Sequence, residues 1–383
     1  MIMYDVIVIG ARCAGSPTAM LLARKGYRVL LVDRATFPSD SPKNHFIRQM
    51  GVAQLARWGL LERVAASGCP PVRKHTVDFG DFPLTGYPPF PDGVDAEYGP
   101  RRIVLDKILG DAAVEAGAEL REGFSVQEIV IEDGRVVGIK GRSKGSESVT
   151  ERAAIVIGAD GHHSIVARTM QPPTYNERPA LTCGYFSYWS EMPCDALEVY
   201  FRSDPAFLLA FPTNYGQTCV AVQVPVREFD AFRTNIEESF LKKIGLAPDL
   251  AERVRNGKRE ERFYGTADLE NFFRKPYGAE PNGGWALVGD AGYHKDPITA
   301  LGVSDAFRDA ELLAEAVDSG LSGREPIEEA LDGYERKRNE AAIPEYENAC
   351  MTASFYPPPP QVFELRAAIR GNQGAINRFM SQG

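Results

Sequence analysis

The spacing of hydrophobic residues along the chain separates two kinds of predicted strand. Short runs that are apolar at nearly every position occur at residues 4–10, 28–33, 153–160 and 285–289. Such runs are typical of parallel strands that are buried on both faces and connected by helices. Small and apolar residues at 14–25 predict a helix between the first two runs. The chain therefore begins with a βαβ unit.

Alternation of apolar and polar residues, with many aromatic residues, marks the middle of the chain instead. It occurs at residues 182–189, 197–202, 207–212 and 218–224. This pattern predicts a separate antiparallel sheet. Alternation also covers 124–140, with a turn at Gly134. Helices are predicted at 51–66, 105–116, 302–318, 326–350 and, after the prolines at 357–360, at 361–380.

These patterns predict an α/β protein in which one domain is discontinuous. A Rossmann-like dinucleotide-binding domain carries an inserted, mostly antiparallel β-sheet domain and is followed by C-terminal helices. The predicted nucleotide-binding domain comprises residues 1–70, 100–170 and 275–340. The predicted substrate-binding sheet domain comprises 71–99 and 171–274, and the C-terminal helical segment comprises 341–383.

A glycine-containing turn joins the first strand to the first helix. Gly10 permits a tight turn, while the small residues Ala14 and Gly15 let the helix approach the strand. The helix N-terminus then offers free N–H groups and a positive dipole to a diphosphate. Asp33, at the end of the second strand, is placed to accept hydrogen bonds from a ribose. Arg12 replaces the middle glycine of the usual pattern, so a turn in another kind of α/β protein is the alternative.

Two further turns follow the later buried strands. Residues 158–168 (GADGHHSIVAR) follow the third strand, and residues 288–303 (VGDAGYHKDPITALGV) follow the fourth. Each turn by itself could belong to many α/β proteins.

The three turns together, in this order and spacing, resemble those of one known family. It is the FAD fold shared by flavoprotein monooxygenases of the p-hydroxybenzoate hydroxylase type and by geranylgeranyl reductases. The resemblance implies that Asp290 binds the flavin ribityl chain and that the helix near Gly302 directs its dipole at the flavin. It also implies that Arg102 contacts FAD phosphate or ribityl and that Val126 lies against adenine, although a surface arginine and a core valine are the alternatives. The full implied set of FAD-binding residues is Gly10, Cys13, Ala14, Gly15, Asp33, Arg34, Arg102, Val126, Asp160, Gly289, Asp290, Pro297, Ala300, Leu301, Gly302 and Val303.

The sequence departs from the family pattern near the expected flavin ring. Ser304 stands where the family has an asparagine, and the family's histidine after G-D-A-A is absent, with Tyr293 in that stretch. The W-x-W-x-I-P signature of flavin halogenases is also absent. The detailed contacts at the flavin edge are therefore expected to differ from the family pattern.

The resemblance also implies a reaction. FAD reduced by NADH or NADPH would react with O2 and transfer one oxygen atom to a small aromatic or apolar substrate. His45 and Asp296 are the candidate catalytic residues, because family loops at both positions approach the flavin. A surface role is the alternative for each. The candidate substrate-binding residues are Tyr185, Tyr188, Trp189, Phe211 and Pro212, for which packing in a core is the alternative.

Three other functions remain open from the sequence. A reductase or dehydrogenase of the geranylgeranyl reductase type would use the same FAD motifs without oxygen. A flavin-bound protein whose redox state controls partner binding is a second alternative. An NAD dehydrogenase is a third alternative, but this function would not explain the Gly289-Asp290 motif.

The composition limits the kinds of partner that the protein is expected to bind. The 383-residue chain has a net charge of -9 and no cluster of Lys or Arg, which argues against nucleic acid or an anionic membrane as a partner. The six cysteines lack CxxC spacing, so we expect reduced thiols and no metal site. No apolar leader or membrane-spanning run is recognised, and we expect a soluble, cytoplasmic protein that acts on a small molecule. The oligomeric state stays open, a homodimer included.

Overall fold

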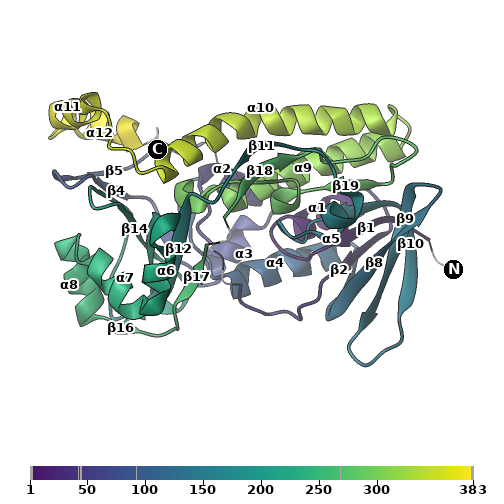
Figure 1. Cartoon of the computed structure of the whole chain (residues 1–383), viewed down its shortest axis with the longest axis horizontal. Coiled ribbons are helices and arrows are strands. Elements are labelled where there is room, and N and C mark those ends of the chain that lie inside the picture. Colours follow the sequence, from purple (N-terminus) through teal and green to yellow (C-terminus); the bar gives the residue numbers. More distant parts are fainter. Residues whose placement is uncertain (1–2, 42, 44, 92, 268, 381–383) are drawn as a thin grey trace.

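The four buried apolar runs lie side by side in one sheet. A computed structural model describes residues 3–41, 43, 45–91, 93–267 and 269–380 of the chain (Figure 1). Parallel pairing joins β2 to β1, β1 to β10 and β10 to β19. The strands of this seven-stranded sheet are β1 (Met3–Ile9), β2 (Val29–Val32), β7 (Glu119–Arg121), β8 (Phe124–Glu132), β9 (Arg135–Ser143), β10 (Val149–Gly158) and β19 (Trp285–Leu287).

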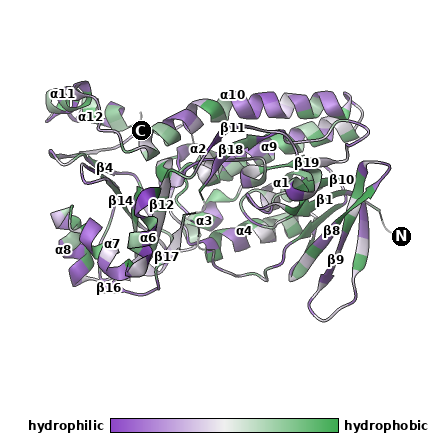
Figure 2. Ribbon diagram, in the orientation of Figure 1, coloured by the Kyte–Doolittle hydropathy of each residue, from purple (hydrophilic) through white to green (hydrophobic). Residues whose placement is uncertain are grey.

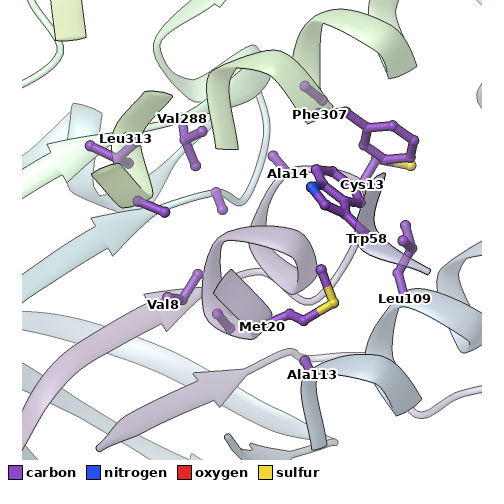
Figure 3. Packing of buried hydrophobic residues seen from close by; sticks show 14 of the residues in the cluster. Val8, Cys13, Ala14, Met20, Trp58, Leu109, Ala113, Val288, Phe307 and Leu313 are labelled. Atoms are coloured by element: carbon purple, nitrogen blue, oxygen red, sulfur yellow. The ribbon is translucent and has the colours of Figure 1, made fainter. Parts of the chain in front are cut away.

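Helices cover this sheet and enclose the main hydrophobic core (Figure 3). Trp58 packs edge-on against Phe307, with ring centroids 5.1 Å apart, and Val8, Met20 and Leu109 belong to the same cluster. The helices around the sheet are α1 (Gly15–Arg24), α2 (Gln49–Trp58), α3 (Leu61–Ala66), α4 (Arg102–Glu115), α5 (Ile165–Met170), α9 (Gly302–Leu321) and α10 (Ile327–Ala353). The single helix predicted at 51–66 is wrong, because Gly59, with φ 75°, ends α2 in a left-handed cap.

A second sheet of eight strands forms the inserted region. All of its neighbouring pairs are antiparallel except β4 with β13. Its strands are β4 (His75–Asp78), β5 (Pro83–Gly86), β12 (Thr182–Ser190), β13 (Leu197–Arg202), β14 (Ala206–Pro212), β15 (Thr218–Pro225), β16 (Lys258–Arg259) and β17 (Tyr264–Thr266). The predicted fold class, an α/β nucleotide-binding fold with an inserted, mostly antiparallel sheet, is therefore confirmed.

Three helices that the sequence patterns did not predict cover the outer face of this second sheet. They are α6 (Phe229–Thr234), α7 (Ile236–Ile244) and α8 (Pro248–Asn256). Each helix is short, so the sequence shows no long periodic pattern of apolar residues there. The sequence signals for their starts are Asn235, which caps α7, and Pro248, which begins α8. Figure 2 shows hydrophilic residues over much of α8, as expected for a solvent-facing helix.

The remaining strands and turns connect the two large sheets. Two small sheets contain β11 (Thr174–Arg178), β18 (Asn271–Arg274) and β20 (Tyr293–His294), and β3 (Pro71–Val72) with β6 (Glu97–Tyr98). The 3-10 turns are η1 (Asn214–Gly216), η2 (Val226–Glu228), η3 (Gly289–Ala291) and η4 (Pro297–Thr299). None of the helices in the described part of the chain has the length and apolar character needed to cross a membrane.

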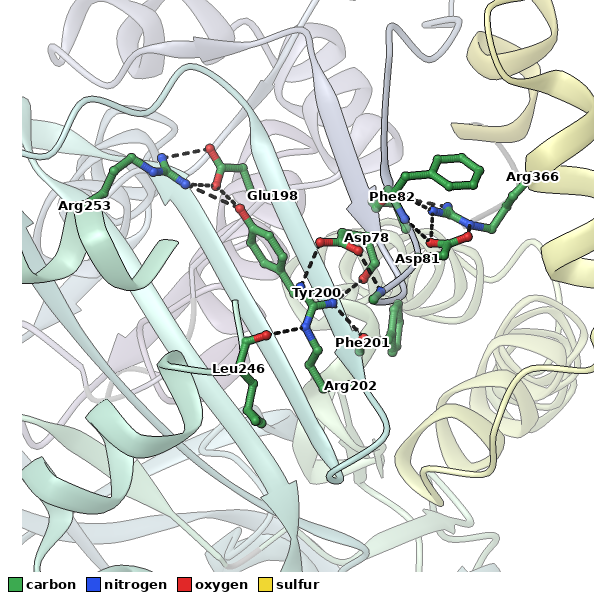
Figure 4. Close-up of polar contacts among 12 residues, drawn as sticks. Asp78, Asp81, Phe82, Glu198, Tyr200, Phe201, Arg202, Leu246, Arg253 and Arg366 are labelled. Atoms are coloured by element: carbon green, nitrogen blue, oxygen red, sulfur yellow. Dashed lines mark hydrogen bonds and ion pairs between the residues drawn. The ribbon is translucent and has the colours of Figure 1, made fainter. Parts of the chain in front are cut away.

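The C-terminal segment packs on the far edge of the second sheet. It forms two helices, α11 (Pro360–Ile369) and α12 (Gln373–Met380), where one helix at 361–380 was predicted; Gly371, with φ 83°, lies between them. Figure 4 shows the fully buried Arg366 paired with Asp81, at 2.8 Å, and Arg202 paired with Asp78, at 2.8 Å. These ion pairs attach α11 and β13 to the β4–β5 hairpin.

One buried carboxylate joins the loop after β20 to the second sheet. Asp296 is fully buried and accepts hydrogen bonds from the Thr182 hydroxyl at 2.7 Å and the Gln223 amide at 2.6 Å. It also accepts from the Ile298 N–H at 3.1 Å. Burial raises the pKa of Asp296 to about 6, although these hydrogen bonds lower it. The carboxylate therefore fixes residues 296–298 against β12 and β15.

We expect this carboxylate to make the stability of the FAD-free protein depend on pH. The folded pKa lies above the ordinary value of 3.8, so the stabilisation is full below pH 3.8 and is lost as the pH rises through about 6. In Asp296→Asn nothing titrates at this position. Urea unfolding should show the wild type losing about 2–3 kcal/mol relative to the variant between pH 4 and 7. A difference that stays constant across this range would contradict the assignment.

Candidate functional site

Three glycine-containing turns meet at one edge of the seven-stranded sheet. In the register of the parallel strands, Gly158 is the partner of both Ile9 and Leu287. Because parallel strands end at the same edge of a sheet, the turns that follow these residues are neighbours. The three motifs found in the sequence, more than 100 residues apart, are thus brought together.

The first turn requires glycine at two positions. Gly10 has φ 103°, and a Cβ there would lie 2.5 Å from the Ala159 carbonyl oxygen. A Cβ on Gly15 would lie 1.7 Å from the Gly10 carbonyl oxygen. Arg12 stands in place of the usual middle glycine, and its guanidinium binds Asp106 at 2.5 Å, with 27% of its side chain exposed.

The N-terminus of α1 is suited to an anion. Its N-cap residue, Ala14, provides no side-chain hydrogen bond, and the first turn contains no acidic residue. The buried hydroxyl of Ser16 has no hydrogen-bond partner within the described residues. The helix dipole and the unsatisfied hydroxyl fit the diphosphate of a dinucleotide.

The Asp33 carboxylate makes hydrogen bonds within the chain that stabilise the first turn. Its carboxylate accepts from the Ala11 N–H at 2.7 Å and the Ala35 N–H at 2.8 Å. Its carbonyl accepts from the Phe124 N–H at 2.8 Å, so β8, with the half-buried Val126, starts beside it. The neighbouring Arg34 is exposed. The predicted ribose contact of Asp33 stays a prediction.

Two predicted cofactor residues have structural partners of their own. Asp160 is exposed and accepts from the Ile165 N–H at 2.8 Å, at the start of α5. Arg102 is buried at the start of α4 and binds Asp106 through Nε at 3.0 Å and Nη2 at 2.9 Å.

Asp106 is the residue of this cluster that the sequence reading missed. It is fully buried, pairs with Arg12 and Arg102, and accepts from the Cys13 thiol at 3.6 Å. Arg102 and Asp106 are spaced i, i+4 on α4, but the helix predicted at 105–116 began after Arg102, so the prediction did not place the two residues on one helix.

The third turn leads into the segment expected to face the flavin. Asp290, in η3, pairs with Lys43 at 2.6 Å. Burial would raise the pKa of Asp290, but the charges of Lys43 and nearby His294 hold it well below its usual value. The carboxylate is therefore ionised at neutral pH, and it accepts hydrogen bonds from a cationic partner that a ligand hydroxyl could replace.

Residues 297–304 combine an unusual backbone with unsatisfied polar atoms. Ala300 has φ 54°, a conformation that non-glycine residues adopt mostly at functional sites. A Cβ on Gly302 would meet only open space, and α9 begins there without a side-chain cap. The buried hydroxyls of Thr299 and Ser304 have no hydrogen-bond partner among the described residues. The exposed Pro297 begins η4, while Leu301 is the N-cap of α9 and Val303 is buried in its first turn.

His45 lies buried between the two large sheets. Its Nδ1 is 3.0 Å from the Gly99 carbonyl oxygen and its Nε2 is 2.9 Å from the Tyr188 hydroxyl. Because a carbonyl can only accept, Nδ1 carries the proton and Nε2 accepts from Tyr188. Burial and the charge of Arg101 lower the pKa of His45 to about 3. His45 is therefore neutral, and this arrangement suits positioning of Tyr188 rather than proton transfer at neutral pH.

The predicted substrate residues divide between the two faces of the second sheet. Tyr188 and Phe211 face the cluster that contains Phe46 and Ile298. Tyr185 and Trp189 face the other way and stack on Phe232 and Phe240 of the outer helices, at 4.6 and 5.7 Å. Successive residues of a strand point to opposite faces, which the sequence reading did not apply to Tyr185 and Trp189. Pro212 is buried where β14 ends.

These observations fit FAD. The diphosphate would bind at α1, the ribityl chain at Asp290, and the flavin ring beside residues 297–304. The unpaired hydroxyls of Ser16, Thr299 and Ser304 supply polar partners along that path. Within the described residues, no group of three or more His, Cys, Asp or Glu is arranged to hold a metal ion.

Comparison with known proteins agrees with this interpretation. Residues 3–346 match the family described as FAD binding domain. The chain is 30% identical over 343 residues to digeranylgeranylglycerophospholipid reductase 2 of Methanothermobacter thermautotrophicus, covering 84% of this chain and 80% of the relative. It is 24% identical over 317 residues to squalene epoxidase 1 of Arabidopsis thaliana, covering 81% of this chain and 58% of the relative.

A solved structure extends the likeness to the whole fold. The myxobacterial chondrochloren halogenase CndH superposes with a TM-score of 0.82 at 20% identity, covering 99% of this chain and 92% of the other. From the three converging turns and the family match, the chain belongs to the FAD binding domain family and is an FAD-dependent oxidoreductase of the p-hydroxybenzoate hydroxylase-like superfamily.

Proposed function

We propose that the protein is a monooxygenase that uses NADH or NADPH and O2 to oxygenate a small aromatic or apolar substrate. The observation that carries the proposal is the apolar inner face of the second sheet. This face comprises Phe186, Tyr188, Phe207, Leu209, Phe211 and Cys219, all at most 7% exposed, and it packs against Ile298 and Ala300. A site that transfers activated oxygen must exclude water, and aromatic side chains do so.

The redox chemistry itself would come from bound FAD, which accepts hydride and reacts with O2. The protein supplies the surroundings. Asp296, held by Thr182 and Gln223, fixes the segment that would lie beside the flavin ring. The N-terminus of α9 directs its dipole at the same place and would stabilise negative charge there. His45 orients the Tyr188 hydroxyl at the inner face.

The ionisable groups at the inner face favour oxygen transfer over reduction of a double bond. Reduction of a double bond adds a hydride and a proton, so a side chain near the substrate usually has to donate the proton. His45 is neutral, with Nε2 already accepting a hydrogen bond. Burial raises the pKa of Tyr188 well above its usual value. Neither His45 nor Tyr188 therefore offers the readily lost proton that reduction of a double bond would take from a side chain.

Reduction without oxygen is the second candidate, because curated relatives at up to 30% identity are named as reductases. One experiment separates the two. The purified, FAD-loaded protein is given NADH or NADPH under 18O2 with a panel of small aromatic compounds and unsaturated isoprenoids. Labelled oxygen in the product supports the monooxygenase. A product that gains two hydrogens under argon would show that the protein is a reductase and not a monooxygenase. NAD(P)H oxidation that no compound stimulates would point to a redox-sensing protein instead.

Asp290 should contribute strongly to FAD binding. Replacing it by alanine removes a charged hydrogen-bond acceptor, which is worth about 1.5–3 kcal/mol. We therefore expect Asp290→Ala to weaken FAD binding by about 10- to 100-fold, as measured by quenching of FAD fluorescence. Asp111→Ala is the control, since Asp111 is 47% exposed and pairs with Lys107 on the same helix. Equal affinities in the two variants would show that Asp290 does not touch the cofactor.

Two tyrosines of one strand give a matched test of the inner face. Tyr188→Phe removes the hydroxyl that donates a hydrogen bond to His45. For the substrate identified in the 18O2 experiment, we expect a several-fold higher KM. We also expect more NAD(P)H to be oxidised than product to be formed. Tyr185→Phe, on the outer face against Phe232, should change neither quantity. If the two variants behave alike in steady-state kinetics, the substrate does not lie on the inner face.

A further inference from the structure

Six residues between β2 and α2 lie along the chain between Asp33, which is bonded to the first turn, and Lys43, which pairs with Asp290 of the third turn. We define residues 36–41 as the strap. At its start, the Phe37 N–H donates to Glu122 at 3.2 Å. All six residues are at least partly exposed, and none belongs to a helix or strand. The strap therefore depends on side-chain contacts for its position.

The first fastening joins the strap to the turn before α1. Arg12 Nη2 donates to the Ser39 hydroxyl oxygen at 3.1 Å. The same guanidinium lies 5.3 Å from the centre of the Phe37 ring. Arg12 itself is fixed by Asp106, so the strap attaches to a rigid part of the diphosphate-binding turn.

The second fastening joins the strap to the start of α4. The Asp40 carboxylate accepts a hydrogen bond from Arg101 Nη2 in an ion pair in which the Arg101 side chain is 5% exposed and that of Asp40 is 23% exposed. Charge-assisted hydrogen bonds of this kind are among the stronger ones in proteins.

Arg101 is held in place by the second sheet. Its Nη1 donates to Gln217 at 3.1 Å, and its guanidinium lies 3.8 Å from the centre of the Tyr188 ring. Its backbone N–H donates to Asn214 at 2.8 Å. Contacts other than Asp40 therefore hold Arg101 in place, and Asp40 is the partner that can move away.

Both fastenings join the strap to residues beside the buried Asp106. Arg12 belongs to the turn at α1, and Arg101 adjoins Arg102 at the start of α4. We propose that the strap closes over bound FAD and that the Asp40–Arg101 pair controls how fast FAD enters and leaves. The proposal rests on FAD as the cofactor and goes beyond the reaction, because it concerns exchange of the cofactor.

This role makes a kinetic prediction that differs from direct binding. A strap fastened in this way has to open before FAD can enter and before it can leave. Weakening the fastening should raise the association and dissociation rate constants together. A residue that touched FAD directly would change mainly the dissociation rate constant.

The test uses Asp40→Asn, which keeps the shape of the side chain and removes its charge. Arg101 retains Glu261, 3.4 Å away, and is not left without a charged partner. Stopped-flow fluorescence of FAD with apoprotein should show both rate constants rising about tenfold or more, with Kd changed less than about threefold. Asp40→Glu, which restores the charge, should return both rate constants toward wild type. Asp95→Asn, which breaks the exposed Arg73–Asp95 pair elsewhere, should leave both unchanged.

Three outcomes would overturn the proposal. Unchanged rate constants in Asp40→Asn would show that the strap does not limit exchange. A rise in the dissociation rate constant alone would make Asp40 a cofactor contact instead. Hydrogen exchange gives an independent readout, since the amides of residues 36–41 should exchange faster in Asp40→Asn than in the wild type. Equal exchange in the two proteins would show that the Asp40–Arg101 pair does not hold the strap.

Discussion

The site depends on the register of three parallel strands. Gly158, at the end of β10, is level with the end of β1 on one side and β19 on the other. Three turns that are distant in the sequence therefore emerge at one sheet edge, and the close contact of Gly10 with Ala159 leaves no room for a side chain. A shift in register would separate the diphosphate-binding turn from Asp290. Strand pairing, rather than any single side chain, is thus the constraint on which cofactor binding rests.

The second sheet is coupled to this edge through buried polar groups. Asp296 joins residues 296–298 to Thr182 and Gln223. His45 joins the loop between β2 and α2 to Tyr188. Both groups sit between apolar surfaces, where an unpaired polar atom would be costly. They therefore set the position of the second sheet relative to residues 296–298 and to the loop that contains His45. His45 does so as a neutral group, and for that reason its predicted acid–base role is not carried into the proposed mechanism.

Much of this organisation could be predicted from sequence, because it follows from local patterns. Continuous apolar runs marked the buried strands, and glycines at fixed spacing marked the turns. The two-residue period of a strand puts Tyr185 and Trp189 on the face opposite Tyr188, but only the folded structure shows that helices cover that face. The buried partner Asp106 required knowledge of which helix face meets the glycine turn. The contacts of Arg101 and Asp40 join residues 61 positions apart in the sequence. No local period encodes such a contact, so only the folded structure shows it.

We expect the three turns to bind a single FAD molecule. A crystal structure of the protein with FAD tests it most directly. We predict density for the diphosphate at the N-terminus of α1, for the ribityl chain at Asp290 and for the flavin ring beside Ala300 and the start of α9. FAD bound elsewhere, or in contact with fewer than all three turns, would contradict the claim.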